Sequence, residues 1–189
     1  AILDALITAG YDVQDAPTDG NSLIASLAAA RNNTGLRLSL HRYKNLFAQL
    51  PPGVRAQIET RWGGPEADPT IKGDAFNLAA IEYGKVIVAI QPSRGYNIDP
   101  QSSYHDPALV PPHGYFALYF YLRYEFAANA LIHNGKHGNL EWLPGKANGL
   151  SESCFPDAVP GPMPHLYPFI VNDPGEGTQA KRRTSAVII

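Results

Sequence analysis

Three short aliphatic runs, each followed by a polar loop and then by helix signals, constrain the fold of this chain more than any other feature. Aliphatic runs and helix signals alternate at residues 85–90, 113–127, 130–133, 139–146, 166–171 and from Pro174 to the end. Strands and helices that alternate in this way are typical of a mostly parallel sheet flanked by helices. We therefore predict an α/β, Rossmann-like fold for this part of the chain.

The first part of the chain has a different pattern. Apolar residues recur at helical spacing near 1–9, 23–30, 40–50 and 54–62, with a short edge strand predicted at 11–13. The polar, Gly/Pro-rich stretch 63–74 is the best candidate for a boundary. The sequence thus predicts a helix-rich N-terminal portion over 1–74 and an α/β portion over 75–189.

Composition excludes several classes of protein. The net charge of the 189 residues is -2, and no long basic block indicates a nucleic-acid partner. No apolar run is long enough to span a bilayer, and a single cysteine, Cys154, fits a reducing compartment. We expect a cytoplasmic protein without membrane segments. Because the chain lacks an initiator Met and ends on bare aliphatic residues, we also expect an internal segment of a longer chain.

Polar side chains cluster after each of the three predicted strands. The clusters are 91–94, 133–137 and 172–176, and two of them directly precede helix signals. The carboxyl ends of parallel strands form the ligand crevice of open α/β sheets, and helix N-termini favour anions. The three clusters are therefore predicted to share one site, with Gln91, His133 and Asn172 along one edge.

The stretch 132–146 holds the strongest candidates for chemistry. His137 and Glu141 are four residues apart, and glycines flank His137. Imidazole with carboxylate suits zinc, cobalt or iron, and equally suits a general base with its orienting partner. The stretch lacks the H-E-x-x-H pattern of zinc proteases. For His133, which follows a buried strand, a hydrogen bond to backbone is the favoured interpretation.

Other polar and aromatic groups have structural interpretations. Gly145-Lys146 is not a phosphate loop, since the required earlier glycine and the following Ser or Thr are missing, so no nucleotide site is predicted. The basic run 181–183 is interpreted as a solvated helix face, in preference to a site for ligand carboxylates. The aromatic residues of 115–126 are interpreted as helix packing, and Cys154 as structural.

Several polar, glycine-rich blocks resemble the family that contains the cobaltochelatase protein CobN and the magnesium chelatase protein of the H type. They are 61–63, 65–69, 91–100 (QPSRGYNIDP), 104–107, 135–146 (GKHGNLEWLPGK) and 164–183, which ends in NDPGEGTQAKRR. Lys136 and the pair Glu141-Trp142 are similar to the cobalt branch, whereas the magnesium branch usually has Thr and Phe there. Asn134 departs from the aliphatic residue or Met expected at its position.

The resemblance implies a fragment of a tetrapyrrole-binding subunit. Such a subunit inserts cobalt, its substrate metal, into hydrogenobyrinic acid a,c-diamide in cobalamin biosynthesis. ATP is hydrolysed by a partner complex of an AAA+ ATPase and a companion chelatase subunit. The missing phosphate loop agrees with that division, and we expect the isolated chain to be inactive.

Residue chemistry and the resemblance together suggest roles at the site. His137 with Glu141 is expected to handle the metal and accept protons, with His105 and Asp106 as second candidates. Arg94, Lys136 and Lys146 are expected to pair with carboxylates of the macrocycle, and Tyr96, Tyr104 or Trp142 to lie against its face. The remaining expected substrate contacts are Asn139, Asn172, Asp173 and Glu176.

Three other functions stay open at this stage. A protein like the H component of magnesium chelatase would insert Mg²⁺ into protoporphyrin. A tetrapyrrole carrier or sensor would bind without catalysis. An α/β hydrolase is disfavoured, because no G-x-S-x-G elbow is present.

Overall fold

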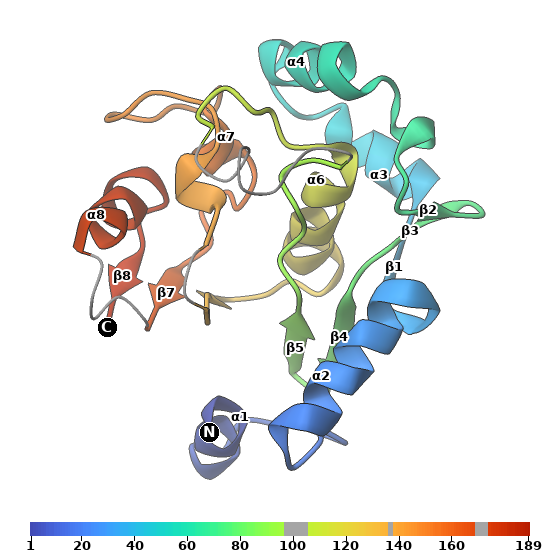
Figure 1. The fold of residues 1–189 in the computed structure, drawn as a ribbon, viewed down its shortest axis with the longest axis vertical. Coiled ribbons are helices and arrows are strands. Elements are labelled where there is room, and N and C mark those ends of the chain that lie inside the picture. The colour runs from blue at the N-terminus through green and yellow to red at the C-terminus, as the bar shows by residue number, and fades with distance from the viewer. Residues whose placement is uncertain (97–105, 136–137, 169–173) are drawn as a thin grey trace.

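The computed structural model describes residues 1–96, 106–135, 138–168 and 174–189 (Figure 1). The helices of these segments are α1 (Ile2–Thr8), α2 (Gly20–Ala29), α3 (Leu40–Phe47), α4 (Pro52–Trp62), α6 (His113–Phe120), α7 (Phe155–Ala158) and α8 (Pro174–Arg183). The π-helical turns are η1 (Ala30–Thr34) and η3 (Tyr121–Glu125), and the 3-10 turns are η2 (Pro65–Ala67) and η4 (Leu140–Trp142). None of these helices is long and apolar enough to cross a membrane.

The strands form three small sheets. An antiparallel sheet has the order β1-β3-β2, from β1 (Arg37–Ser39), β2 (Ile71–Lys72) and β3 (Ala75–Asn77). An antiparallel hairpin joins β4 (Ala80–Tyr83) to β5 (Val86–Ala89). A parallel sheet has the order β6-β7-β8, from β6 (Leu131–Ile132), β7 (His165–Tyr167) and β8 (Val187–Ile188). The predicted α/β class with a parallel sheet is confirmed, and the Rossmann-like arrangement stays a prediction.

Some predicted elements were wrong in detail. The run at 86–89 is a strand, but it pairs antiparallel with β4 and is only half-buried, because Gly84, at φ +65°, turns the chain straight back. The final helix does not continue to the end of the chain. It ends at Arg183, and Val187–Ile188 returns as a parallel strand beside β7. The predicted edge strand at 11–13 does not form.

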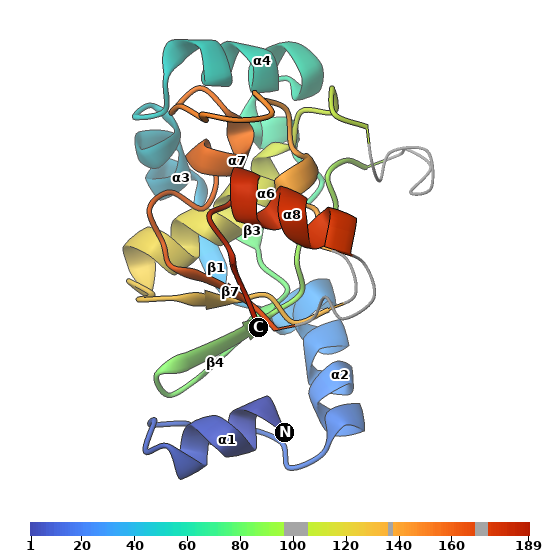
Figure 2. The same ribbon diagram turned by 90° about the vertical axis from the view of Figure 1, so that its left-hand side faces the viewer.

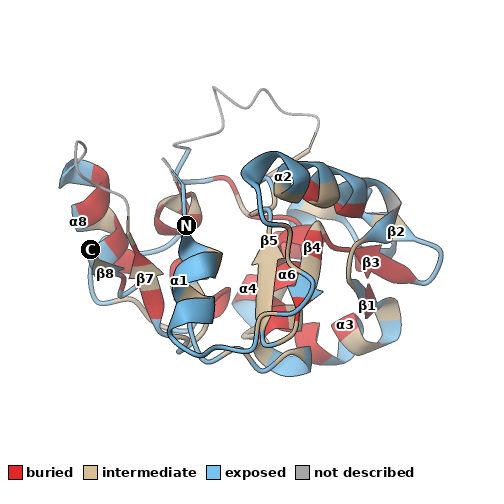
Figure 3. Cartoon of the chain, turned by 90° about the horizontal axis from the view of Figure 1, so that it is seen from below, coloured by how far each residue is buried: buried red, intermediate tan, exposed pale blue. Residues whose placement is uncertain are grey.

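The helices of the first part begin where the sequence supplies caps. Asp19 accepts a hydrogen bond from Ser22 N–H at the start of α2, and Ser39 accepts one from Arg42 N–H at the start of α3. Pro52 opens α4, where a missing N–H costs nothing. Figure 3 shows that α1 and most of α2 are exposed, in contrast to α6.

Helix α6 is the centre of the hydrophobic core. All eight of its residues are buried, as expected of a helix that is apolar all round. Figure 1 places α6 between the α8–β7–β8 group on one side and α3 with the β1–β3 strands on the other, and Figure 2 shows the same elements from the side. Core side chains come from both halves of the chain, among them Tyr43, Ile58 and Phe76 together with Phe116 and Phe155. The boundary predicted at residue 74 stays a prediction.

Buried polar groups at the start of α6 are satisfied from the polar stretch 63–74. Asp68 accepts the N–H of Gly114 at 2.8 Å, which caps the helix, and also binds the N–H and hydroxyl of Thr70. His113 bridges the Tyr43 hydroxyl, 2.8 Å from Nδ1, and the Gly63 carbonyl oxygen, 2.9 Å from Nε2. This stretch therefore fixes where the central helix begins.

We expect Gly35→Ala to destabilise the fold, since a Cβ there would lie 1.8 Å from the Leu78 carbonyl oxygen and 2.7 Å from that of Ala30. Backbone atoms cannot yield cheaply, so the free energy of unfolding should fall by about 2 kcal/mol or more. Gly53→Ala is the control, because nothing lies within 4 Å of its Cβ position. Urea denaturation that gives equal stabilities for both variants would contradict the packing described here.

Candidate functional site

Glu141 is the centre of a buried polar cluster. It lies on η4, and none of its surface is exposed. Its negative charge contributes to the raised pKa values of Tyr115, Tyr119 and Tyr167, although burial is the largest cause for each. The same charge opposes the lowering, by burial, of the pKa values of Arg94 and Arg183. The carboxylate thus lies within electrostatic range of these three tyrosines and two guanidinium groups.

Gln91 and Asn139 join the end of the hairpin to the start of η4. Asn139 N–H donates to Gln91 Oε1 at 3.2 Å, and Gln91 Nε2 donates to the hydroxyls of Tyr119 at 3.0 Å and Tyr115 at 3.3 Å. The Tyr115 hydroxyl donates in turn to Asn139 Oδ1. A closed network of this kind fixes its members in one arrangement. Gln91 and Asn139, far apart in sequence, are thus brought together, although the strand before Gln91 belongs to the antiparallel hairpin and not to the parallel sheet.

Gly138 allows His133 and Glu141 to approach the backbone between them. A Cβ on Gly138 would lie 2.5 Å from His133 Cε1 and 3.2 Å from Glu141 Oε2. The Gly138 N–H donates to the Tyr167 hydroxyl at 2.6 Å. A glycine is therefore required beside Glu141 for steric reasons, and β7 anchors the turn that carries it.

Two imidazoles stack with Tyr167 on the parallel sheet. The centroid of the His133 ring lies 5.1 Å from that of Tyr167 and 5.4 Å from that of His165. The Thr184 hydroxyl donates to Ala180 O, so His165 Nδ1 donates to Thr184 and His165 Nε2 is left as an acceptor. Among the described residues, His133 Nδ1 and His165 Nε2 are buried without hydrogen-bond partners. The expected hydrogen bond from the His133 side chain to backbone is therefore not formed by Nδ1.

Two arginines, the predicted site residue Arg94 and the unpredicted Arg183, are buried and bind backbone carbonyl oxygens. Arg94 is 4% exposed, and its Nη2 donates to the carbonyl oxygens of Asp106, at 2.5 Å, and Leu109, at 3.3 Å. Arg183 is 6% exposed and binds three carbonyl oxygens of the segment that begins at Glu141. The interpretation of 181–183 as a solvated face holds for Lys181 and Arg182, which are exposed, and is wrong for Arg183.

The other described candidates differ in their exposure to solvent. Tyr96 packs on Trp62 with centroids 4.6 Å apart, and Asp106 is exposed, with Oδ1 accepting Ala108 N–H. Trp142 follows Glu141 on η4 and is half-buried, whereas Glu176 is buried in the first turn of α8. Six candidates lie outside the described residues, namely Tyr104, His105, Lys136, His137, Asn172 and Asp173. Their predicted roles stay predictions.

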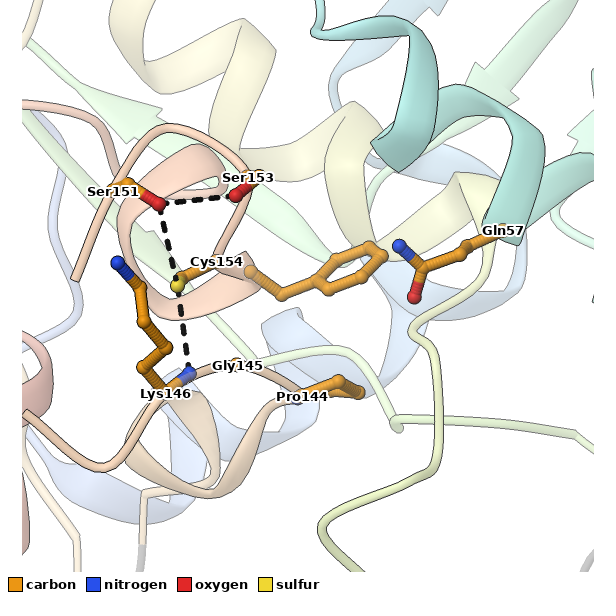
Figure 4. Close-up of a pocket in the computed structure, with 8 residues that line it drawn as sticks. Gln57, Pro144, Gly145, Lys146, Ser151, Ser153 and Cys154 are labelled. Atoms are coloured by element: carbon orange, nitrogen blue, oxygen red, sulfur yellow. Dashed lines mark hydrogen bonds between the residues drawn. The ribbon is translucent and has the colours of Figure 1, made fainter.

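Lys146 lies on a shallow cavity of about 460 Å³ together with Cys154 (Figure 4). The other lining residues are Gln57, Pro144, Gly145, Ser151, Ser153 and Phe155. Burial raises the pKa of Cys154, but hydrogen bonds from Ser151 and from the Lys146 N–H outweigh that effect and lower it. Within the part of the chain that is described, no three His, Cys, Asp or Glu residues are grouped to hold a metal ion.

Sequence reasoning missed several members of the Glu141 cluster. Tyr115 and Tyr119 were assigned to packing, and they are buried, yet their hydroxyls bind the groups that fix η4. Their spacing of four residues on an apolar helix was the available signal, because it places both hydroxyls on one face. For Arg183 the signal was its helical spacing from Ala180 and Glu176, which are also buried.

We expect the protein to lose stability as the pH falls from about 6.5 to about 4. Burial, and next the neighbouring His165, lower the pKa of His133 from 6.5 to about 4. The unfolded chain therefore binds a proton in this range before the folded chain does, so unfolding becomes easier as pH falls. Loss of about 3 kcal/mol is expected from His133. In His133→Asn the free energy of unfolding, measured by denaturation, should depend less on pH than in the original protein. The exposed control His41→Asn should keep the original pH dependence. An unchanged pH dependence in His133→Asn would contradict the assignment.

Comparison with known proteins gives the family. All residues, 1–189, match the family model described as CobN/Magnesium Chelatase. The chain is 57% identical to the aerobic cobaltochelatase subunit CobN of Sinorhizobium sp and 53% identical to that of Pseudomonas aeruginosa, with all of the chain covered in both cases. It is 34% identical to the H-type magnesium-chelatase protein of Rhodobacter capsulatus, again over the full chain.

A solved structure supports the same relationship. The catalytic subunit of cobaltochelatase from Mycobacterium tuberculosis superposes with a TM-score of 0.88 at 42% identity, and the match covers 100% of this chain and 17% of that one. The chain spans 15% and 16% of the lengths of the two CobN relatives. By sequence and by structure, the chain belongs to the CobN/magnesium chelatase family.

Proposed function

We propose that this chain is part of the tetrapyrrole-binding subunit of an ATP-dependent cobaltochelatase. The subunit would insert Co²⁺ into hydrogenobyrinic acid a,c-diamide, while ATP is hydrolysed by an AAA+ ATPase and its companion protein. The observation that carries the proposal is a carboxylate with no exposed surface, Glu141, whose backbone is bound by the buried Arg183 and whose charge acts on two arginines and three tyrosines. The family relationship supports the same proposal, since CobN subunits are the relatives with 53% and 57% identity.

Cobalt is favoured over magnesium as the metal that is inserted. Identity to the magnesium-chelatase relatives is 32–36%, well below the values for the CobN subunits. The pair Glu141-Trp142 agrees with the cobalt branch at the same place in the motif. Comparing Co²⁺ and Mg²⁺ insertion by the complete complex tests this choice.

The proposed role of Glu141 is to accept the protons that leave the ring nitrogens as the metal enters. A buried carboxylate on a backbone segment that is held in place needs little rearrangement during proton transfer, and it acts where water competes poorly. Nearby positive groups favour the ionised form of a carboxylate, whereas burial favours the protonated form. His137 is proposed as its partner in metal handling and proton transfer.

Substrate contacts are proposed from both ends of the site. Asn139 directly precedes η4 and Trp142 is its last residue, so an amide and an indole lie close to Glu141 in the chain. Lys146 is exposed and is proposed to pair with a carboxylate of the macrocycle. Arg94 would act mainly by holding the segment near Asp106, since its Nη2 already binds two carbonyl oxygens.

Glu141→Gln in the full-length subunit should reduce Co²⁺ insertion at least tenfold, the scale expected for loss of a general base. Glutamine keeps the volume of the buried side chain, so the melting temperature should change little. Glu152→Gln, at an exposed carboxylate, is the matched control and should keep full activity. Full insertion activity in Glu141→Gln would exclude Glu141 as the base. Absence of turnover in the unsubstituted complex would favour a carrier or sensor.

Gly138→Ala should reduce insertion activity strongly, whereas Gly135→Ala in the same motif should not. A methyl group on Gly138 would lie 2.9 Å from His133 Nδ1 and 3.2 Å from Glu141 Oε2, while nothing lies within 4 Å of the Gly135 position. The added methyl group must push one of these side chains aside, and displacement of a catalytic group by about 1 Å can cost about a hundredfold in rate. Steady-state insertion assays on both variants decide the point, and equal rates would contradict it.

A further inference from the structure

Arg183 is a buried cation at the end of a helix whose neighbouring cations are exposed. It closes α8, and 6% of its surface is exposed, whereas Lys181 and Arg182 face solvent. Helix α8 contacts η4, which carries Glu141. A buried guanidinium keeps its charge, so its surroundings must supply acceptors.

The acceptors are three carbonyl oxygens of one short segment. Arg183 Nη1 donates to Glu141 O at 2.6 Å, Nη2 donates to Leu143 O at 2.9 Å, and Nε donates to Lys146 O at 3.2 Å. The last carbonyl groups of a helical turn lack partners within the turn. Arg183 therefore supplies the missing hydrogen-bond donor to the carbonyl group of Glu141. It also holds the chain just after the proposed base, through Leu143 and Lys146.

The charge of Arg183 also reaches the side chain of Glu141. Burial lowers the pKa of Arg183, and the charges of Cys154 and Glu141 oppose that change. Arg94 interacts with Glu141 in the same sense and repels Arg183. The Glu141 carboxylate accordingly lies within the field of two buried cations from distant parts of the chain.

We propose that Arg183 is a positioning residue for metal insertion, which fixes the backbone of Glu141 through three carbonyl oxygens and so sets the direction of its carboxylate. The proposal rests on the proposed function, because it assumes that Glu141 is the base. Arg183 does not contact the macrocycle in this scheme. Its effect is on the chemical step and not on substrate affinity.

The test is Arg183→Lys in the full-length subunit, assayed with its ATPase partners. Lysine keeps the charge, but a single ammonium group cannot bind three carbonyl oxygens in fixed directions. We expect kcat for Co²⁺ insertion to fall at least tenfold, with KM and the tetrapyrrole Kd, measured by absorbance titration, within about twofold of the original. Amide hydrogen exchange over 140–146 should become faster.

Two controls separate positioning from general stability. Arg182→Lys changes an exposed neighbour on the same helix and should leave kcat unchanged. Arg123→Lys removes a guanidinium that binds the carbonyl oxygens of Ala158 and Val159, both at 3.3 Å, and none of the Glu141 segment. This variant should lower the melting temperature but not kcat. Should Arg183→Lys fail to fold, Arg183→Gln, which retains amide donors, is compared in the same way.

Three results would overturn the proposal. The first is an unchanged kcat in a folded Arg183 variant. The second is a loss of kcat that is accompanied by an equal loss of tetrapyrrole binding, as a structural defect would give. The third is a slow Arg183→Lys beside a fully active Glu141→Gln, which would show that Arg183 does not act through Glu141. If Glu141→Gln is inactive and Arg183→Lys is normal, the proposed function stands and only this inference fails.

Discussion

Burial of the Glu141 carboxylate is the interaction on which the rest of this site depends. Removing a carboxylate from water costs several kcal/mol even after relaxation, so the surrounding groups must return most of that free energy. Arg94 and Arg183 supply positive charge within range of the carboxylate, and the hydroxyls of Tyr115 and Tyr167 hold Asn139 and Gly138 beside it. These groups come from a loop, two helices and a strand. The fold therefore brings them together around one charge that would otherwise be unstable in the interior.

Helix α6 has two functions in this arrangement. Its apolar side chains form the middle of the core, and two of its tyrosines direct hydroxyls toward Gln91 and Asn139. The cap that Asp68 provides sets the start of the helix, and so the position of those hydroxyls along its axis. A substitution in the polar stretch 63–74 that moves α6 would thus also move η4, although the two segments are distant in sequence.

The positions of the helices and strands could be predicted from the sequence better than the pairing of the strands. Caps and helical spacing located α2, α4 and α6, and aliphatic runs located β5, β6 and β7, because these signals are local. The antiparallel partner of β5 was not foreseen, since an aliphatic run does not specify its neighbour. The strand at Val187–Ile188 was predicted as part of the final helix, because no Gly or Pro after Gly177 marks the end of that helix. At the site, residue chemistry indicated Glu141 and Asn139, whose roles stay predictions. Arg183 was missed because a basic run gives no sign of which member faces inward.

The segment 138–146 shows how a precise site can be built with little regular structure. It contains a single 3-10 turn, and each part of it is held by a residue from elsewhere in the chain. Tyr167 holds Gly138, Gln91 holds Asn139, and Arg183 holds the carbonyl groups from Glu141 onward. Because the three holding residues lie on a strand, a hairpin end and a helix, their positions follow from the fold and not from the segment itself. Because its segment is held at both ends, Glu141 cannot move far, and in its proposed role as base the proposed macrocycle would have to be brought to it.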